Sequence, residues 1–214
     1  MRPTALLLLV SLALAGPALA QGQRFAPPPG TCLLPQTFFL PLLEALQDFG
    51  VLPEGAAADC AEVEALGRGE RPQGLEAPVA VLARPALAAT GADPAQAAAV
   101  IPRLRTEVPA EARALLGPRA ERPEIAQALD ARDAGRILAL LPPRQEAIYL
   151  PLPAPEGEAR FLLDIPASQE RVLFAAFPRR GAVGWAIVLD AAHPAPLAPS
   201  LALLDAMARA NRGP

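Results

Sequence analysis

The chain has 214 residues, of which 52% are hydrophobic, enough for a medium-sized domain with a buried core. Its 19 basic residues are all arginine and face 22 acidic residues, giving a formal net charge of −3. Because the arginines form no long basic run, the composition argues against a nucleic-acid partner. The 27 prolines predict short helices and stiff loops.

The first twenty residues have the pattern of a secretory signal peptide. Arg2 supplies a charged start, residues 5–15 form an apolar core, and Ala18-Leu19-Ala20 is an A-x-A cleavage site. The alternative is an uncleaved membrane anchor, but the apolar segment is shorter than the ~20 residues that span a bilayer. We therefore expect cleavage after Ala20, no stable membrane anchor, and a periplasmic or secreted product.

The two cysteines of the chain, Cys32 and Cys60, both lie in the exported part, after an extended Pro-rich leader at residues 21–30. An even number of cysteines in an oxidising compartment predicts a structural disulfide. A metal site or a redox pair is the alternative. Two cysteines with one distant histidine do not have a zinc-binding spacing, and there is no C-x-x-C motif.

Short helices separated by prolines are predicted over residues 31–144. Asp59 with Glu62 resembles a capping box that starts a helix ending at Gly67. Residues 79–83 fit either a short buried strand or the start of a helix, and Pro53-Glu-Gly55 is typical of a turn. The other helices are expected over 41–49, from 94 to an end or kink at Pro102, over 109–116, over 123–129 and from 134 to 141.

Four apolar runs in residues 145–214 predict an antiparallel meander. The runs are as long as typical strands, are rich in aromatic and β-branched residues, and are separated by short Pro/Gly segments. Connections this short require antiparallel neighbours, and Pro151 places the first run at an edge or a bulge. The runs are residues 147–152, 160–165, 171–177 and 183–189, followed by a helix over 201–210. The predicted fold class is α+β: a mainly helical part, then a four-stranded meander and a C-terminal helix, with 31–214 as one domain.

Residues able to carry catalysis are few. His193 is the single histidine, and neither Ser168 nor Ser200 lies in a nucleophile-elbow sequence. The carboxylate pairs Glu62/Glu64, Glu156/Glu158 and Asp164/Asp190 are interpreted as solvated acids at turns, strand ends and helix faces. We assign no catalytic residue, no metal ligand and no cofactor, because nucleotide-binding and zinc-hydrolase motifs are missing from the sequence.

A few residues are weak candidates for binding. Arg179 and Arg180 lie at the expected tip of the last hairpin, where guanidinium groups could contact an anionic partner. Trp185 and Tyr149, each the single residue of its type, fit sheet packing better than a ligand platform, and His193 fits a loop. The sequence therefore predicts an exported, non-enzymatic binding or interaction protein for an unknown protein or small molecule. The alternatives are a hydrolase using carboxylates or His193, and a structural envelope protein.

Overall fold

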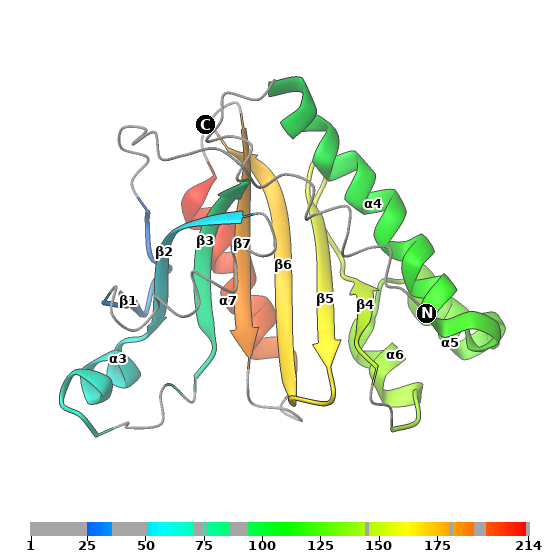
Figure 1. The fold of residues 1–214 in the computed structure, drawn as a ribbon, viewed down its shortest axis with the longest axis horizontal. Helices are drawn as coiled ribbons and strands as arrows, with labels where there is room; N and C mark the ends of the chain where they lie inside the picture. The colour runs from blue at the N-terminus through cyan, green and yellow to red at the C-terminus, as the bar shows by residue number, and fades with distance from the viewer. Residues whose placement is uncertain are drawn as a thin grey trace.

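A single antiparallel sheet of seven strands organises the protein (Figure 1). The computed structural model describes residues 25–35, 51–70, 75, 77–85, 94–143, 146–179, 182–190 and 196–212. The strands are β1 (Thr31–Leu33), β2 (Val51–Asp59), β3 (Val79–Pro85), β4 (Ile148–Pro151), β5 (Ala159–Ile165), β6 (Glu170–Arg179) and β7 (Ala182–Asp190). Their spatial order is β1-β2-β3-β7-β6-β5-β4. With its helices, the sheet gives the α+β fold that the sequence predicts.

The four predicted strands of the C-terminal part are present and pair in chain order. β4 pairs with β5, β5 with β6 and β6 with β7, all antiparallel. Pro151 lies in β4, which is an edge strand of the sheet. This placement follows from proline, which lacks the N–H that an interior strand would use for a second ladder.

The predicted four-stranded sheet is too small, because three strands from the first part of the chain extend it. The ambiguous segment at residues 79–83 is β3, which pairs with β7. The turn expected at Pro53-Glu-Gly55 is instead a bulge within β2, where the register against β3 shifts between Pro53 and Gly55. β2 is rich in alanine, glycine and proline, so its propensity is low, and pairing with β3 stabilises it as a strand.

The helices include one correction to the sequence analysis. They are α3 (Cys60–Gly67), α4 (Pro94–Leu116), the 3-10 helix η2 (Gly117–Glu121), α5 (Pro123–Asp130), α6 (Ala134–Leu140) and α7 (Ala198–Asn211). α4 continues through Pro102 and Pro109, where separate helices are predicted. Each proline removes one helical hydrogen bond, but Ile101 and Val108, which directly precede the two prolines, are buried and hold the helix against the sheet. The helix predicted at 41–49 lies outside the described residues.

Side-chain caps begin two short helices, and the cap at Asp59 follows the sequence prediction. Asp59 accepts hydrogen bonds from the backbone N–H groups of Ala61 and Glu62 at the start of α3. Asp133 accepts one from Arg136 at the start of α6. Side-chain oxygens at these positions satisfy amide groups that have no partner inside the helix.

Helices pack on both faces of the sheet: α7 lies behind it, and α4 runs diagonally along its β5–β4 side in Figure 1 and contacts β4, β5, β6 and β7. On the α7 face, the core contains Leu82, Leu173 and Phe177 from the sheet and Leu204 and Met207 from α7. α5, α6 and the C-terminal half of α4 also contribute to that core. On the α4 face, a second core contains aromatic residues of β5, β6 and β7. None of the described helices has the length and hydropathy needed to cross a bilayer.

The described part of the predicted leader is attached to the sheet. The ring of Phe25 lies against Gly55, where an added Cβ would be only 2.7 Å from a ring carbon. The side-chain amide of Asn211 accepts a hydrogen bond from the N–H of Ala26 (3.0 Å) and donates one to its carbonyl (2.8 Å). The first described residues are therefore joined to the end of α7.

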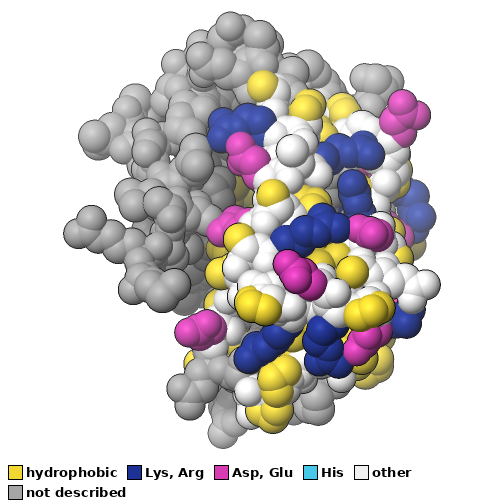
Figure 2. All heavy atoms as spheres, turned by 90° about the vertical axis from the view of Figure 1, so that its right-hand side faces the viewer, with side chains coloured by type: hydrophobic (Ala, Val, Ile, Leu, Met, Phe, Trp, Pro, Cys, Tyr) yellow, Lys and Arg dark blue, Asp and Glu magenta, His cyan; other side chains and the backbone are white. Residues whose placement is uncertain are grey.

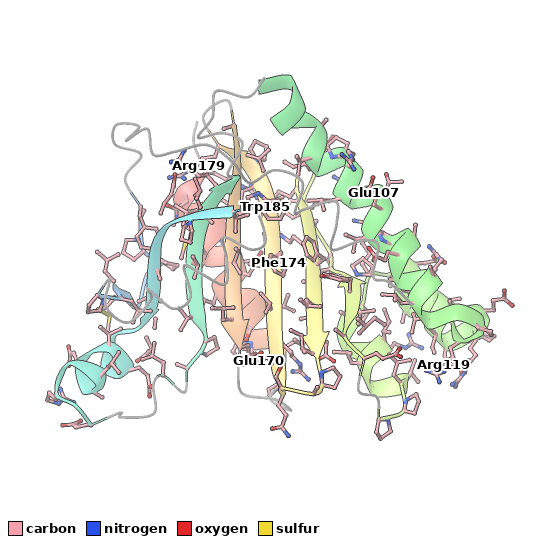
Figure 3. The ribbon with its side chains drawn as sticks, in the orientation of Figure 1. Glu107, Arg119, Glu170, Phe174, Arg179 and Trp185 are labelled. Carbon is pink, nitrogen blue, oxygen red and sulfur yellow. A yellow bond between two sulfur atoms is a disulfide. The ribbon has the colours of Figure 1, made fainter. Side chains whose placement is uncertain are left out.

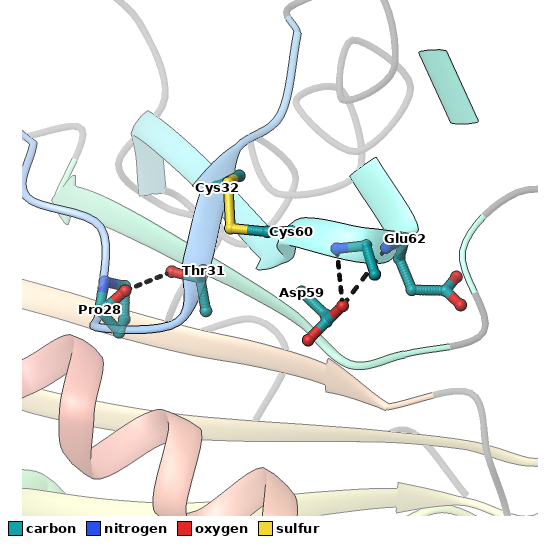
Figure 4. The surroundings of a disulfide bond; sticks show 7 residues. Pro28, Thr31, Cys32, Asp59, Cys60 and Glu62 are labelled. Atoms are coloured by element: carbon teal, nitrogen blue, oxygen red, sulfur yellow. Dashed lines mark hydrogen bonds between the residues drawn. A yellow bond between two sulfur atoms is a disulfide. The ribbon is translucent and has the colours of Figure 1, made fainter. Parts of the chain in front are cut away.

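The disulfide predicted from the sequence is present between Cys32 of β1 and Cys60 of α3 (Figure 4). Their Cα atoms are 4.8 Å apart, and the residues are 28 positions apart in the chain. The bond attaches the three-residue edge strand β1 to the start of α3. A disulfide of this kind indicates a non-reducing compartment.

We predict that replacing both cysteines with alanine lowers the free energy of unfolding by about 3–4 kcal/mol, because the unfolded chain then regains the entropy of an open loop. Denaturant unfolding of the C32A/C60A variant measures this loss. Reduction of the wild-type protein should produce a similar loss. Equal stability of the oxidised wild-type protein and the variant would show that the bond does not stabilise the fold.

Candidate functional site

The predicted binding residues do not come together in one place. Trp185 and Tyr149 lie on the α4 face of the sheet, whereas Arg179 belongs to the opposite, α7 face (Figure 3). Arg180 and His193 lie outside the described residues. The described residues therefore offer two separate regions, one aromatic and one ionic.

The aromatic region joins four strands on the α4 face. Phe161 and Phe174 stack with ring centroids 4.6 Å apart and planes inclined by 15°. Trp185 meets Phe161 edge-on at 6.3 Å, and Tyr149 is tilted against the same ring at 6.2 Å. These arrangements are the favourable ones for aromatic pairs, so packing explains most of the region.

Trp185 has one feature that packing does not explain. It is buried, with 4% exposed, and its indole nitrogen Nε1 has no hydrogen-bond partner in the part of the chain that the structure describes. A buried N–H without an acceptor costs about 1–3 kcal/mol. The indole N–H is therefore a candidate contact point on this face.

Tyr149 is half-buried at the edge of the sheet and is affected electrostatically by α4. Burial raises the pKa of its phenol, and the charge of Glu111 raises it further. The pKa of Glu111 is itself raised by burial and, secondarily, by the like charge of Glu107. This corner of the molecule disfavours negative charge, so Tyr149 is not suited to act as a base.

The ionic region, which we call the Glu54 cluster, consists of Glu54, Arg84 and Arg179. The Nη1 group of Arg179 donates a hydrogen bond to Oε2 of Glu54, and Nε of Arg84 lies 3.6 Å from Oε1. The side chains are 6% exposed for Arg179, 15% for Glu54 and 27% for Arg84. Arg179 is thus buried, in contrast to its expected position in a solvated turn.

Two local features bring these groups together. The bulge at Glu54 bends β2, and the Val51 end of the strand curves toward β7 in Figure 1. Gly184 of β7 leaves space for the Arg179 stem, because a Cβ at Gly184 would lie 3.0 Å from Cδ of Arg179. The same Cβ would lie 2.8 Å from the ring of Phe177. Arg179 can therefore reach Glu54 on β2.

The Glu54 cluster contains two guanidinium groups and one carboxylate, so it has one surplus positive charge. A guanidinium group carries five N–H donors, and one carboxylate does not use all the donors of two arginines. Elsewhere in the described residues the excess is acidic: Arg68 contacts both Glu64 and Glu70, and Arg171 stands between two aspartates. On the face shown in Figure 2, arginine and acidic side chains are interspersed. Arg113 pairs with a single carboxylate, Asp130.

The acids expected to be solvated at strand ends are buried in ionic contacts, which corrects the sequence interpretation. Asp164 and Asp190, 1% and 3% exposed, stand opposite Arg171 on the two neighbouring strands. Arg171 donates a hydrogen bond to Asp164 (3.2 Å), and Ser200 donates one to Asp190 (2.6 Å). Both carboxylates are therefore engaged in contacts within the fold.

Glu158, expected to be solvated in a turn, is also buried, with 1% exposed. It accepts hydrogen bonds from Nε and Nη2 of Arg160 at 3.0 and 2.8 Å and forms an ion pair with Arg212. Arg160 also donates to Asp205 of α7. This balanced network attaches α7 to β5.

Neither metal-binding groups nor similarity to known proteins assigns a function to these two regions. Among the described residues, no group of three histidine, cysteine or acidic side chains could hold a metal ion. Comparisons with protein families, curated proteins and solved structures found no match. Function must therefore be argued from the two regions alone.

Sequence reasoning missed Glu54 and Arg84 as members of an ionic site. Glu54 lies in a Pro-Glu-Gly sequence that is typical of a turn, and Arg84 precedes a proline in a segment of ambiguous structure. Neither position carries a signal for its partner, because the partners lie on other strands. Only the sheet order brings them together.

We predict that replacing Gly184 with alanine destabilises the protein by about 1–3 kcal/mol, because the new methyl group overlaps the Phe177 ring and the Arg179 stem. Denaturant unfolding measures the loss. The double variant G184A/F177L should lose less than the sum of the two single variants.

Gly135 provides the matched control. It lies in α6, and a Cβ there would make only ordinary contacts, the nearest at 3.6 Å. Alanine should therefore stabilise the helix by about 0.5–1 kcal/mol. If G184A and G135A behave alike, the close approach at Gly184 is not the cause.

We also predict that E111Q raises the melting temperature at pH 7. The folded protein raises the pKa of Glu111, so the favourable contribution of its protonated form is present below the unfolded pKa of ~4.3 and is lost as the pH rises. Glutamine removes the cost of keeping a half-buried carboxylate charged at pH 7. The difference in melting temperature between E111Q and the wild-type protein should vanish at low pH, where Glu111 is protonated. The ultraviolet titration of Tyr149, the single tyrosine, should shift to lower pH in E111Q.

Glu124 is the control for Glu111, because its pKa is shifted in the opposite direction. Its pKa is lowered by its own backbone N–H and by a hydrogen bond from Arg122. Its stabilising contribution is present above the unfolded pKa and is lost as the pH falls, so E124Q should lower the melting temperature at pH 7. Melting curves of equal midpoint for E111Q and E124Q across this range would contradict the electrostatic assignment.

Proposed function

We propose that the protein is an exported, non-enzymatic binding module that recognises an anionic group of a partner through the Glu54 cluster. The signal-peptide pattern and the disulfide support a periplasmic or secreted location. The observation that carries the proposal is the surplus of one guanidinium group in a partly exposed cluster. The ligand chemistry is a carboxylate or a phosphate, on a protein or on a small molecule.

The two arginines of the Glu54 cluster have different roles. Arg179 is buried and ion-paired, so it acts as a positioning residue that holds Glu54 in place. Arg84 is the most exposed of the three and lies at the longer distance from Glu54, so it is the contact residue. Arginine suits this role because its planar fork matches two oxygens of a carboxylate or a phosphate group.

The two alternative functions have less support from the described residues. A hydrolase needs an accessible nucleophile or a free carboxylate, but Ser200 and Asp190 are buried and hydrogen-bonded to each other. A structural envelope protein would not need a cationic surplus. The structural envelope function therefore predicts no saturable binding of anions.

The test is a titration of the oxidised protein with citrate and, separately, with inorganic phosphate, followed by the Nε–H resonance of Arg84. We expect a saturable shift that weakens with added salt. R84Q lacks this resonance, so its affinity is measured by calorimetry beside the wild-type protein. It should bind at least about tenfold more weakly, since a hydrogen bond to a charged group contributes about 1.5–3 kcal/mol. E54Q should bind more tightly, because the competing carboxylate is neutralised.

R113Q is the matched control, because Arg113 is an exposed arginine paired with a single carboxylate, Asp130. It should bind both anions as the wild-type protein does. Equal affinity of R84Q and the wild-type protein, or no saturable shift with either anion up to about 10 mM, which corresponds to a binding free energy near −3 kcal/mol, would refute the proposal. A preference for citrate or phosphate identifies the class of anionic group.

A further inference from the structure

The α4 face contains a second candidate site, independent of the Glu54 cluster on the other face. Its centre is Trp185 in the central strand β7. The residues in register beside it are Ala83 on β3 and Ala176 on β6, and Ala159 follows on β5. The indole ring is thus the one bulky side chain among these four paired positions.

The indole N–H of Trp185 is an unusual group in this place. More than nine-tenths of buried polar groups in proteins have a hydrogen-bond partner, but Nε1 of Trp185 has none among the described residues. Phenylalanine would supply an aromatic ring here without leaving a polar atom unsatisfied. The donor is therefore available to an acceptor that binds from outside the chain.

The surroundings define the chemistry of that acceptor. The hydrophobic core that contains Trp185 also contains Phe161, Phe174 and Ile187. An ion would lose its hydration there without gaining a counter-charge, so the surroundings exclude charged ligands. They fit a small apolar molecule with one hydrogen-bond acceptor, such as an ester, a ketone or an ether.

The covering helix offers a route to the site. α4 packs over this face through Ile101 and Val108, and it contains Pro102 and Pro109. Each proline removes one hydrogen bond from the helix, so the segment that covers the face depends on its packing against the sheet more than a regular helix does. A shift of this segment would open a path to the buried indole.

We propose that the α4 face binds a small, uncharged, mainly apolar molecule whose acceptor atom takes the hydrogen bond of Trp185 Nε1–H. Trp185 supplies the single polar contact, and the stacked rings of Phe161 and Phe174 supply an apolar wall. Tyr149 is not part of the polar contact.

The test uses methyl hexanoate as the probe and the full exported chain as the protein. Trp185 is the single tryptophan, so its indole N–H gives one resolved nitrogen–proton resonance. The expected result is a saturable downfield shift of that proton as the ester accepts its hydrogen bond. No saturable shift up to the solubility limit of the ester would overturn the proposal.

Two variants locate the contact. W185F keeps an aromatic ring and removes the N–H, and calorimetry should show at least about tenfold weaker binding of the ester. Y149F removes the hydroxyl of the neighbouring tyrosine and should bind as the wild-type protein does. Weaker binding by Y149F with unchanged binding by W185F would contradict the assignment. The wild-type resonance tests the site even if W185F does not fold.

Discussion

The pairing of β3 with β7 is the contact on which the rest of the structure depends. It joins residues 79–83 to residues 185–189, which are about a hundred positions apart in the chain, into one antiparallel ladder. Without it, β1–β3 and β4–β7 would be two smaller sheets, each with an additional unpaired edge. Both proposed sites require this ladder. Ala83 lies beside Trp185, and the Glu54 cluster draws residues from β2, β3 and β6.

Charged groups lie at the ends of the strands on the α7 face, and apolar side chains fill the middle. One end carries the Glu54 cluster and the pair of Glu158 with Arg160, and the other carries Asp164, Arg171 and Asp190. Arginine remains charged at any physiological pH, so each buried guanidinium needs an acid beside it. Both proposals rest on surplus donors among the described residues: the second guanidinium of the Glu54 cluster and the indole N–H of Trp185.

The sequence predicts the C-terminal meander well because its signals are local. β-branched and aromatic runs define the strands, Pro/Gly segments define the turns, and Pro151 defines the edge. The same signals fail for β2, whose Pro-Glu-Gly and alanine residues have little strand propensity and depend on β3 for pairing. They also fail for α4, where tertiary packing maintains a helix through two prolines.

The candidate sites were less predictable than the fold for a related reason. Sequence analysis selected Arg179 and Trp185, but it placed the arginine in a solvated turn because its acidic partner lies on β2, far away in the chain. It treated Asp164 and Asp190 as solvated acids, because nothing in a strand end shows which strand lies beside it. Ion pairs across a sheet become visible only when the strand order and register are known.

Hydrogen exchange followed by mass spectrometry tests the central claim most directly. If β3 pairs with β7 in one cooperative sheet, peptides covering residues 79–85 and 182–190 should exchange their amides at similarly slow rates. They should also become exposed together as denaturant is added. Fast exchange of the 79–85 peptide, with protection retained in the 182–190 peptide, would show that the first three strands do not belong to a common sheet.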